Sequence, residues 1–127
     1  MHALRHVHEL LVPGGTMLDL HPVTEQQVEA DERIVGVIRE PEFVDRDLPN
    51  AEAGVDQVIA EGLYVVEAGI KFDVLQHFDT AQDLLEKEAH HLATQQEVVQ
   101  VIRRTPPPLL LREHVVLRRL RALPAPE

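Results

Sequence analysis

Two side chains capable of acid–base chemistry, Asp19 and His21, lie close together in the short apolar stretch TMLDLHP, residues 16–22. A strand of this kind in an open α/β sheet presents ligand-binding residues at its carboxyl end, where His21 lies. A histidine there can donate a hydrogen bond or act as a weak base, since its charge changes near neutral pH. We therefore predict a small-molecule pocket that contains His21 and Asp19. The alternatives are a histidine that only closes the strand before Pro22 and an aspartate that faces solvent.

Side-chain alternation along this strand places Met17 and Asp19 on one face and Leu18 and Leu20 on the other.

The remaining histidines have simpler interpretations. His2 and His6 are four residues apart, a spacing that brings two imidazoles to one side of a helix. No third ligand is evident, because His8 points elsewhere, so we predict no metal site and a solvated first turn. His90 and His91 end an expected helix, where positive charge complements the helix dipole.

A hydrolytic site is not indicated either. Asp73 and Asp79 bracket His77, and a carboxylate–histidine pair is a known catalytic arrangement. The chain has no serine and no cysteine to act as the nucleophile, and Thr80 is better placed as a helix cap. We therefore predict no catalytic residue.

The elements that must position the candidate pocket alternate between helix and strand, which favours an α/β layer arrangement. Residues 24–40 leave two alternatives: a helix with Thr24 as its N-cap, or a hairpin of Gln27–Ala30 with Ile34–Ile38 that turns at Asp31-Glu32. For the other segments we expect a helix over 2–11, a strand over 16–21, a loop over 41–50, a helix from the N-cap Asn50 to Gly62, a strand over 70–77, helices over 80–92 and 95–103, and a last strand over 109–120.

Within the expected strand 70–77, Ile70, Phe72, Val74 and Gln76 share one face, which we expect to be the better buried one. In the helix that follows, Thr80 can form a capping box with Asp83.

Composition narrows the function classes. The net charge of −10 argues against nucleic-acid binding, which needs an excess of Lys and Arg. No stretch approaches a membrane span or an apolar signal sequence, so we expect no membrane partner and a cytoplasmic location. The length of 127 residues fits a single domain, which we place at 1–123, with a disordered tail at 124–127.

Three segments together resemble a known family. The stretch ALRHVHELLVPGGTMLDLHPV resembles the helix, Pro-Gly-Gly turn and fifth strand of class I S-adenosylmethionine-dependent methyltransferases. FDVLQHFDTAQDLLEKEAHH is similar to the sixth strand and following helix of many members, and REHVVLRRLRAL to their closing antiparallel strand. The resemblance implies the second half of a Rossmann-like methyltransferase domain, with a mixed sheet of three to five strands packed with helices.

The resemblance does not extend to the family's donor site. That site needs a glycine-rich loop, and none of the six glycines lies in a Gly-x-Gly-x-Gly run, so we expect no bound cofactor. The chain then acts as an oligomerising or small-molecule-binding module that is not catalytic alone. We expect a homo-oligomer, in the simplest case a dimer, through the exposed edge at Thr16–Leu20. One alternative is part of an active methyltransferase whose donor site comes from a partner chain or a preceding segment. The other is a small binding protein that only shares these sequence patterns.

Overall fold

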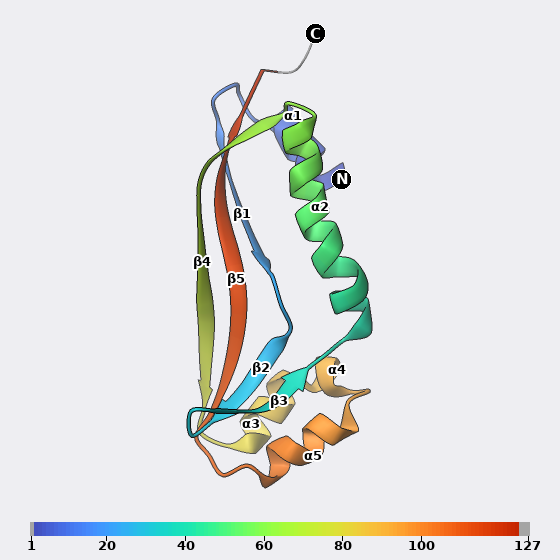
Figure 1. Ribbon diagram of the computed structural model, residues 1–127, viewed down its shortest axis with the longest axis vertical. Helices are drawn as coiled ribbons and strands as arrows, with labels where there is room; N and C mark the ends of the chain where they lie inside the picture. Colours follow the sequence, from blue (N-terminus) through green and yellow to red (C-terminus); the bar gives the residue numbers. More distant parts are fainter. Residues whose placement is uncertain (1, 125–127) are drawn as a thin grey trace.

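The computed structural model describes residues 2–124, with side chains from residue 3 onward, and forms one long, twisted sheet with helices at both ends (Figure 1). In chain order the elements are α1 (His2–Leu10), β1 (Thr16–Pro22), β2 (Gln26–Ala30), β3 (Arg33–Ile38), the π-helical turn η1 (Phe43–Asp47), α2 (Leu48–Ala60), β4 (Tyr64–Phe78), α3 (Ala81–Lys87), α4 (Ala89–Leu92), α5 (Gln96–Arg104) and β5 (Leu109–Ala122).

The last strand, β5, is the centre of the sheet. Along one side it pairs with β4, from Tyr64 opposite Ala122 to Phe78 opposite Leu109. Along the other side it pairs first with β2 and then with β1, and β3 extends the sheet beyond β2.

All of these pairs are antiparallel, so the expected mixed sheet is wrong in this respect, whereas the α/β class and the number of five strands are confirmed. The reason is that β5 lies between β1 and β4, the strands that run in the same direction, and keeps them from pairing with each other.

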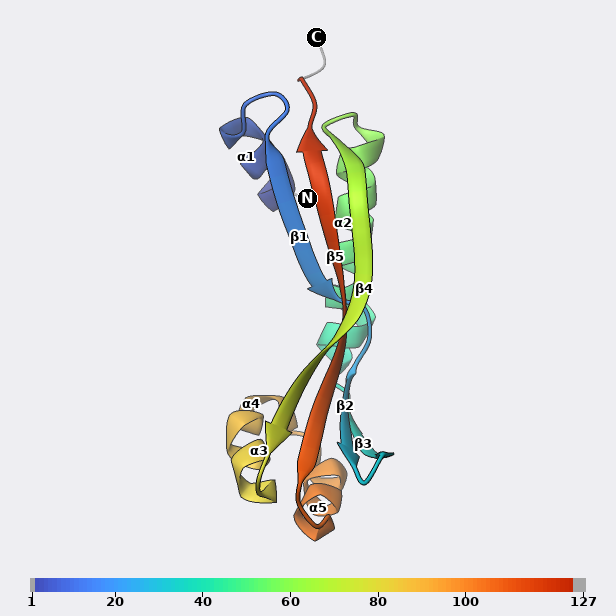
Figure 2. The same cartoon turned by 90° about the vertical axis from the view of Figure 1, so that its left-hand side faces the viewer.

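The two hydrophobic cores lie on opposite faces of β5. Leu109 and Leu111 point into a core that α3, α4 and α5 close, together with the β2–β3 hairpin. Leu120 and Ala122, which have the other parity along the strand, point into a core beneath α1 and α2. Each end of the sheet is therefore covered by helices on one face only, as Figure 2 shows for the upper half, where α2 lies behind the strands.

Residues 24–40 form the hairpin, and the alternative of a helix capped by Thr24 is wrong. Asp31 and Glu32 take positive φ angles of 52° and 61°, the conformation that closes a tight two-residue turn. The β-branched stretch of β3 favours a paired strand, and Val28 of β2 is fully buried.

The loop expected over 41–50 is wrong, because helical structure begins at Pro41 and continues through η1 into α2. Both prolines of this segment lie in first turns, Pro41 at the start and Pro49 at the beginning of α2, where a missing N–H costs no hydrogen bond. Asn50 consequently lies inside α2 and is not its N-cap. The predicted stop is confirmed, since Gly62 follows the helix with a φ of +77°.

The helix expected over 80–92 begins as predicted but is interrupted at Glu88, which separates α3 from α4. Thr80 caps α3 by accepting a hydrogen bond from the Asp83 N–H at 3.1 Å. The expected strand 70–77 lies within the longer β4. The face expected to be better buried is exposed in large part, because no helix within residues 2–124 covers it there: Ile70 is 60% and Phe72 39% exposed.

Candidate functional site

The predicted residues Asp19 and His21 lie on the face of β1 that looks toward α2. Strand register places Asp19 beside Arg118 of β5, and His21 beside Val116. Along its other edge β5 pairs with β4, where Val116 lies opposite Lys71. His21, Val116 and Lys71 therefore lie side by side across the three strands.

His21 is held between two carboxylates. It is buried, with 8% of its surface exposed. Its Nδ1 lies 2.8 Å from Asp19 Oδ2, and its Nε2 lies 3.0 Å from Oε2 of Glu52 in α2. Each contact is a hydrogen bond only when that nitrogen carries a proton, so the doubly protonated ring satisfies both carboxylates at once. The structure thus brings Asp19 and His21 together and adds Glu52, which the sequence did not indicate.

Glu52 joins this histidine to Arg118. Its other oxygen, Oε1, accepts a hydrogen bond from the Arg118 guanidinium. That hydrogen bond is the main cause of a pKa below the ordinary value for Glu52, to which His21 adds and which partial burial opposes. Two carboxylates, a histidine and an arginine therefore meet at the junction of α2 with the sheet.

A hollow of about 210 Å³ opens beside this cluster. Pro22, Val23, Leu48 and Val116 give it apolar walls, and its polar lining comes from His21, Glu52, Arg118 and Lys71. Within the described part of the chain, Lys71 has no carboxylate oxygen within 4 Å. Lys71 is therefore a cation of this site without an ion pair to a described residue.

This arrangement suits binding better than acid–base chemistry. Both nitrogens of His21 are engaged by carboxylates, so the ring has no free nitrogen with which to take a proton from a ligand. No serine, cysteine or threonine lines the hollow. The unpaired ammonium and the apolar walls fit a small molecule that carries an anionic group at one end.

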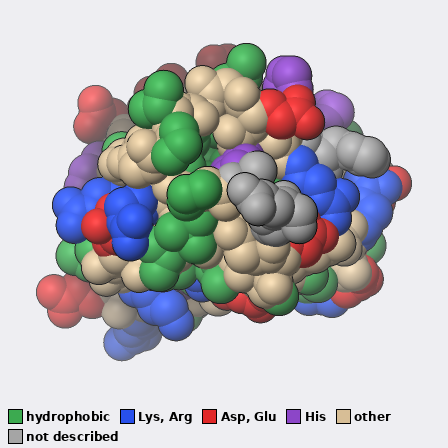
Figure 3. All heavy atoms as spheres, turned by 90° about the horizontal axis from the view of Figure 1, so that it is seen from above, with side chains coloured by type: hydrophobic (Ala, Val, Ile, Leu, Met, Phe, Trp, Pro, Cys, Tyr) green, Lys and Arg blue, Asp and Glu red, His purple; other side chains and the backbone are tan. Residues whose placement is uncertain are grey.

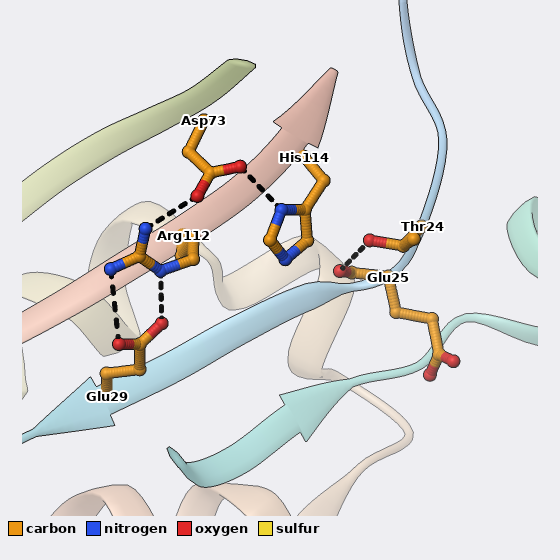
Figure 4. A network of polar contacts seen from close by, with 6 residues as sticks. All are labelled: Thr24, Glu25, Glu29, Asp73, Arg112 and His114. Atoms are coloured by element: carbon orange, nitrogen blue, oxygen red, sulfur yellow. Dashed lines mark hydrogen bonds and ion pairs between the residues drawn. The ribbon is translucent and has the colours of Figure 1, made fainter. Parts of the chain in front are cut away.

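A second polar cluster lies on the same sheet face, closer to the hairpin (Figure 4). Arg112 of β5 is bound on one side to Glu29 of β2, at 2.5 Å from Nε to Oε2, and on the other to Asp73 of β4, at 2.6 Å from Nη1 to Oδ2. His114 Nδ1 contacts the second oxygen of Asp73 at 2.5 Å. Hydrogen bonds from Arg112, and secondarily from His114, hold the pKa of Asp73 below its usual value. These charges satisfy one another, and the cluster connects three strands.

The carboxylate–histidine pair considered around His77 is not formed: its neighbour in sequence, Asp73, binds Arg112 and His114. Among the described residues, no three histidine or carboxylate side chains are arranged to hold a metal ion. The side chain of His2 lies outside the described residues, and His6 lies 3.6 Å from Glu9.

Sequence reasoning missed Glu52, Arg118 and Lys71. Their positions depend on the register of β5 between β1 and β4 and on how α2 packs, neither of which a local pattern reveals. One signal was available: Arg112, His114, Val116 and Arg118 alternate along the last strand, so they had to share a face.

Comparison with known proteins gives no relative: no protein-family model matches the chain, and no significant match exists among the curated proteins or the solved structures. No helix within residues 2–124 has the length and apolar character needed to cross a membrane.

Proposed function

We propose that the chain is a methyltransferase-like half-domain that binds a small anionic molecule beside His21, works as a homo-oligomer, and does not transfer a methyl group by itself. The observation that carries the binding function is the hollow between α2 and the sheet, with its buried His21–Glu52–Arg118 cluster and the unpaired Lys71. At about 210 Å³ it is smaller than the roughly 300–1,000 Å³ of typical ligand pockets, so the ligand is a small one.

The relation to methyltransferases draws support from the order of the elements. A helix, a Pro-Gly-Gly turn and β1 come first, and after the β2–β3 hairpin come α2, β4, three short helices and the antiparallel β5. The three similar segments appear in the same order. The 127 residues contain no Gly-x-Gly-x-Gly loop for the methyl donor, and both nitrogens of His21 are occupied. A binding function therefore fits these residues better than methyl transfer by this chain alone.

The binding proposal can be tested with benzoate, a small carboxylate with an apolar body. We expect NMR titration of labelled protein to show shifts at Lys71 and His21, with a dissociation constant near the millimolar order, typical of a fragment held by one charge, about −4 kcal/mol. Lys71→Gln should weaken binding severalfold. Lys87→Gln, a change at the only other lysine of the chain, is the matched control and should leave binding unchanged. Equal binding by both variants, or no shifts near Lys71, would overturn the proposal.

Oligomerisation is supported by the open flank of β1. This strand is bonded to β5 on one side and to no described strand on the other. The Val23 N–H donates to the His114 carbonyl, so alternation directs the N–H groups of Leu18 and Leu20 toward the open side. Unpaired donors of this kind invite another strand. Light scattering coupled to size exclusion should show a dimer or larger species, and a monomer at high micromolar concentration would refute this part.

The same open flank favours a second candidate: the functional part of a methyltransferase whose donor site comes from a partner chain or a preceding segment. Calorimetric titration with S-adenosylmethionine separates the two. Our first proposal predicts no heat of binding to this chain alone, and stoichiometric binding would refute it. For the second candidate, the DNA upstream of the Met1 codon should encode an in-frame glycine-rich loop, and its absence there would leave only a partner chain as the source.

A further inference from the structure

The upper half of the sheet has an apolar face that no described helix covers. β1, β5 and β4 lie side by side in front of α2, as Figure 2 shows. Of the side chains that point away from α2, those on β1 and β4 are largely exposed, whereas Val115 on the central strand is only 4% exposed. We call this surface the open face and define it by its exposed apolar side chains: Leu18 (64% exposed), Leu20 (58%), Ile70 (60%), Phe72 (39%) and Val74 (36%).

The size of the open face fits a modest protein contact. It is three strands wide and about four residue rows long, which gives roughly 15 Å by 25 Å at the spacings of a β-sheet. The largest apolar patch on a monomeric protein is typically about 300–600 Å² and is often functional, and the open face lies in this range. A stable interface buries about 800 Å² on each partner, so the open face supplies about half and the surroundings must supply the rest.

Charges of opposite sign lie at its two ends. The residues of β5 that share the open face are, in order, Glu113, Val115, Leu117 and Arg119. Arg119 is exposed, and among the described residues no carboxylate oxygen lies within 4 Å of its guanidinium. Glu113 accepts only a long hydrogen bond, 3.4 Å, from the Gln26 amide.

Figure 3 looks down on the upper end of the molecule and shows Lys and Arg side chains next to Asp and Glu side chains on both sides of an apolar group. The end of the open face at Glu113 continues into a hollow of about 260 Å³, where Glu113 lies near His91 and Glu40, which contact each other. The apolar surface thus has Arg119 at one end and Glu113 at the other, neither in an ion pair with another described residue, some 20 Å apart at the rise of a β-strand.

From this pattern we infer that a second copy of the chain packs face to face on the open face. The two copies are related by a two-fold axis that lies between the two sheets and runs perpendicular to the strands. This arrangement rests on the proposed homo-oligomer and places its interface on the open face instead of along the flank of β1. Because the rotation reverses the strand direction, Arg119 of each copy meets the partner's Glu113, and Val115 meets the partner's Leu117. A single rotation therefore pairs both charges in both copies.

The neighbouring strands are compatible with the same rotation. Each strand faces its own counterpart in the other copy, so Phe72 lies against the partner's Ile70, and Val74 against the partner's Ala68. A large residue thus meets a small one at the end of β4. The net charge of −10 disfavours nucleic acid and an anionic membrane surface as occupants, and a strand added along β1 would leave the open face exposed.

Charge reversal at β5 tests the arrangement without altering the flank of β1. We expect sedimentation equilibrium to give a dimer of micromolar dissociation constant, and Arg119→Glu or Glu113→Arg to raise that constant at least tenfold, since each places like charges together. The double variant Arg119→Glu/Glu113→Arg should return to within about threefold of the natural protein. Arg103→Glu on α5, which is also exposed, is the control and should dimerise normally. Circular dichroism would confirm that each variant is folded.

The outcomes separate this inference from the proposed oligomer itself. A monomeric natural protein refutes both. A dimer that tolerates both charge reversals refutes the face-to-face arrangement and keeps the oligomer. A dimer weakened by both reversals but not restored in the double variant also refutes it.

A cross-linking experiment gives an independent readout. The chain has no cysteine, so a single introduced one is unique. In the proposed dimer, the rotation axis passes at the level of Val116 and Lys71, so Ile70 lies one residue from it along β4. Two copies of Ile70→Cys should therefore be joined by a short bismaleimide. Gln82→Cys, on α3 at the far end, should not be joined. Equal cross-linking at the two positions would contradict the arrangement.

Discussion

Replacing Glu52 by Gln should destabilise the protein, because one carboxylate connects α2 to two basic groups of the sheet. Its oxygens contact Arg118 and the Nε2 of His21. Hydrogen bonds to charged groups contribute about 1.5–3 kcal/mol each when well buried. Glu52 is 43% exposed in its side chain, so solvent screening lowers this value, and glutamine keeps one acceptor. We therefore expect a loss of about 1–2 kcal/mol, or a Tm lower by about 4–8 °C in a domain of this size.

The assay is thermal unfolding followed by circular dichroism at pH 7, with Glu42→Gln as the matched control. Glu42 is 83% exposed and lies 3.7 Å from Arg46, so its replacement should change stability by less than about 0.5 kcal/mol. An equal fall in the two variants, or no fall in Glu52→Gln, would show that the His21–Glu52–Arg118 cluster does not hold α2 to the sheet.

The pH dependence gives a second check. The pKa of Glu52 is lower in the folded protein than in the unfolded chain, so its stabilising effect is present above the unfolded pKa of about 4.3 and is lost as the pH falls through the folded value. The Tm difference between the natural protein and Glu52→Gln should therefore narrow as the pH is lowered from 6 toward 3. A difference that stays constant over this range would contradict the assignment.

Three further predictions concern stability elsewhere. Burial raises the pKa of Glu88, so keeping this carboxylate ionised costs stability as the pH rises above the unfolded pKa. Glu88→Gln should therefore raise the free energy of unfolding by about 1 kcal/mol at pH 7 and have little effect at pH 4, which parallel thermal melts would measure. Ile102→Ala empties a fully buried position between α5 and the sheet and should cost about 2–5 kcal/mol in urea unfolding, whereas Ile34→Ala, at a position 58% exposed, should cost little. Thr80→Ala removes the cap of α3 and should cost about 1 kcal/mol, with faster amide hydrogen exchange at Asp83 than in the natural protein.

Local patterns in the sequence predicted those parts of the fold that depend on local chemistry. The Pro-Gly-Gly turn, the cap at Thr80 and the β-branched stretch of β3 each express a preference of neighbouring residues, and each is found. The segment 41–50 shows the limit of such reasoning, since Pro and Asp are typical of loops but also of first helical turns. Only the position of Pro41 and Pro49 within the helix distinguishes the two.

Long-range features could not be predicted in the same way. Alternation along β4 correctly grouped Ile70 with Phe72, yet it could not say whether another element covers them, and none within the described residues does. In the candidate site, too, the local contact could be predicted and the long-range contact could not. The spacing of Asp19 and His21 already placed them on one face, whereas Glu52 comes from a helix 31 residues further along the chain. Its contact depends on how α2 packs on the sheet.

The central place of β5 has a consequence for how the protein reaches its native state in the cell. Every element that packs on this strand precedes it in the chain, so a ribosome synthesises both groups of helices and the other four strands before the strand that joins them. Until then β1 and β4 have no neighbour to bond, and their apolar residues stay accessible to chaperones and to other nascent chains. We expect productive folding to begin only after Ala122 has left the exit tunnel.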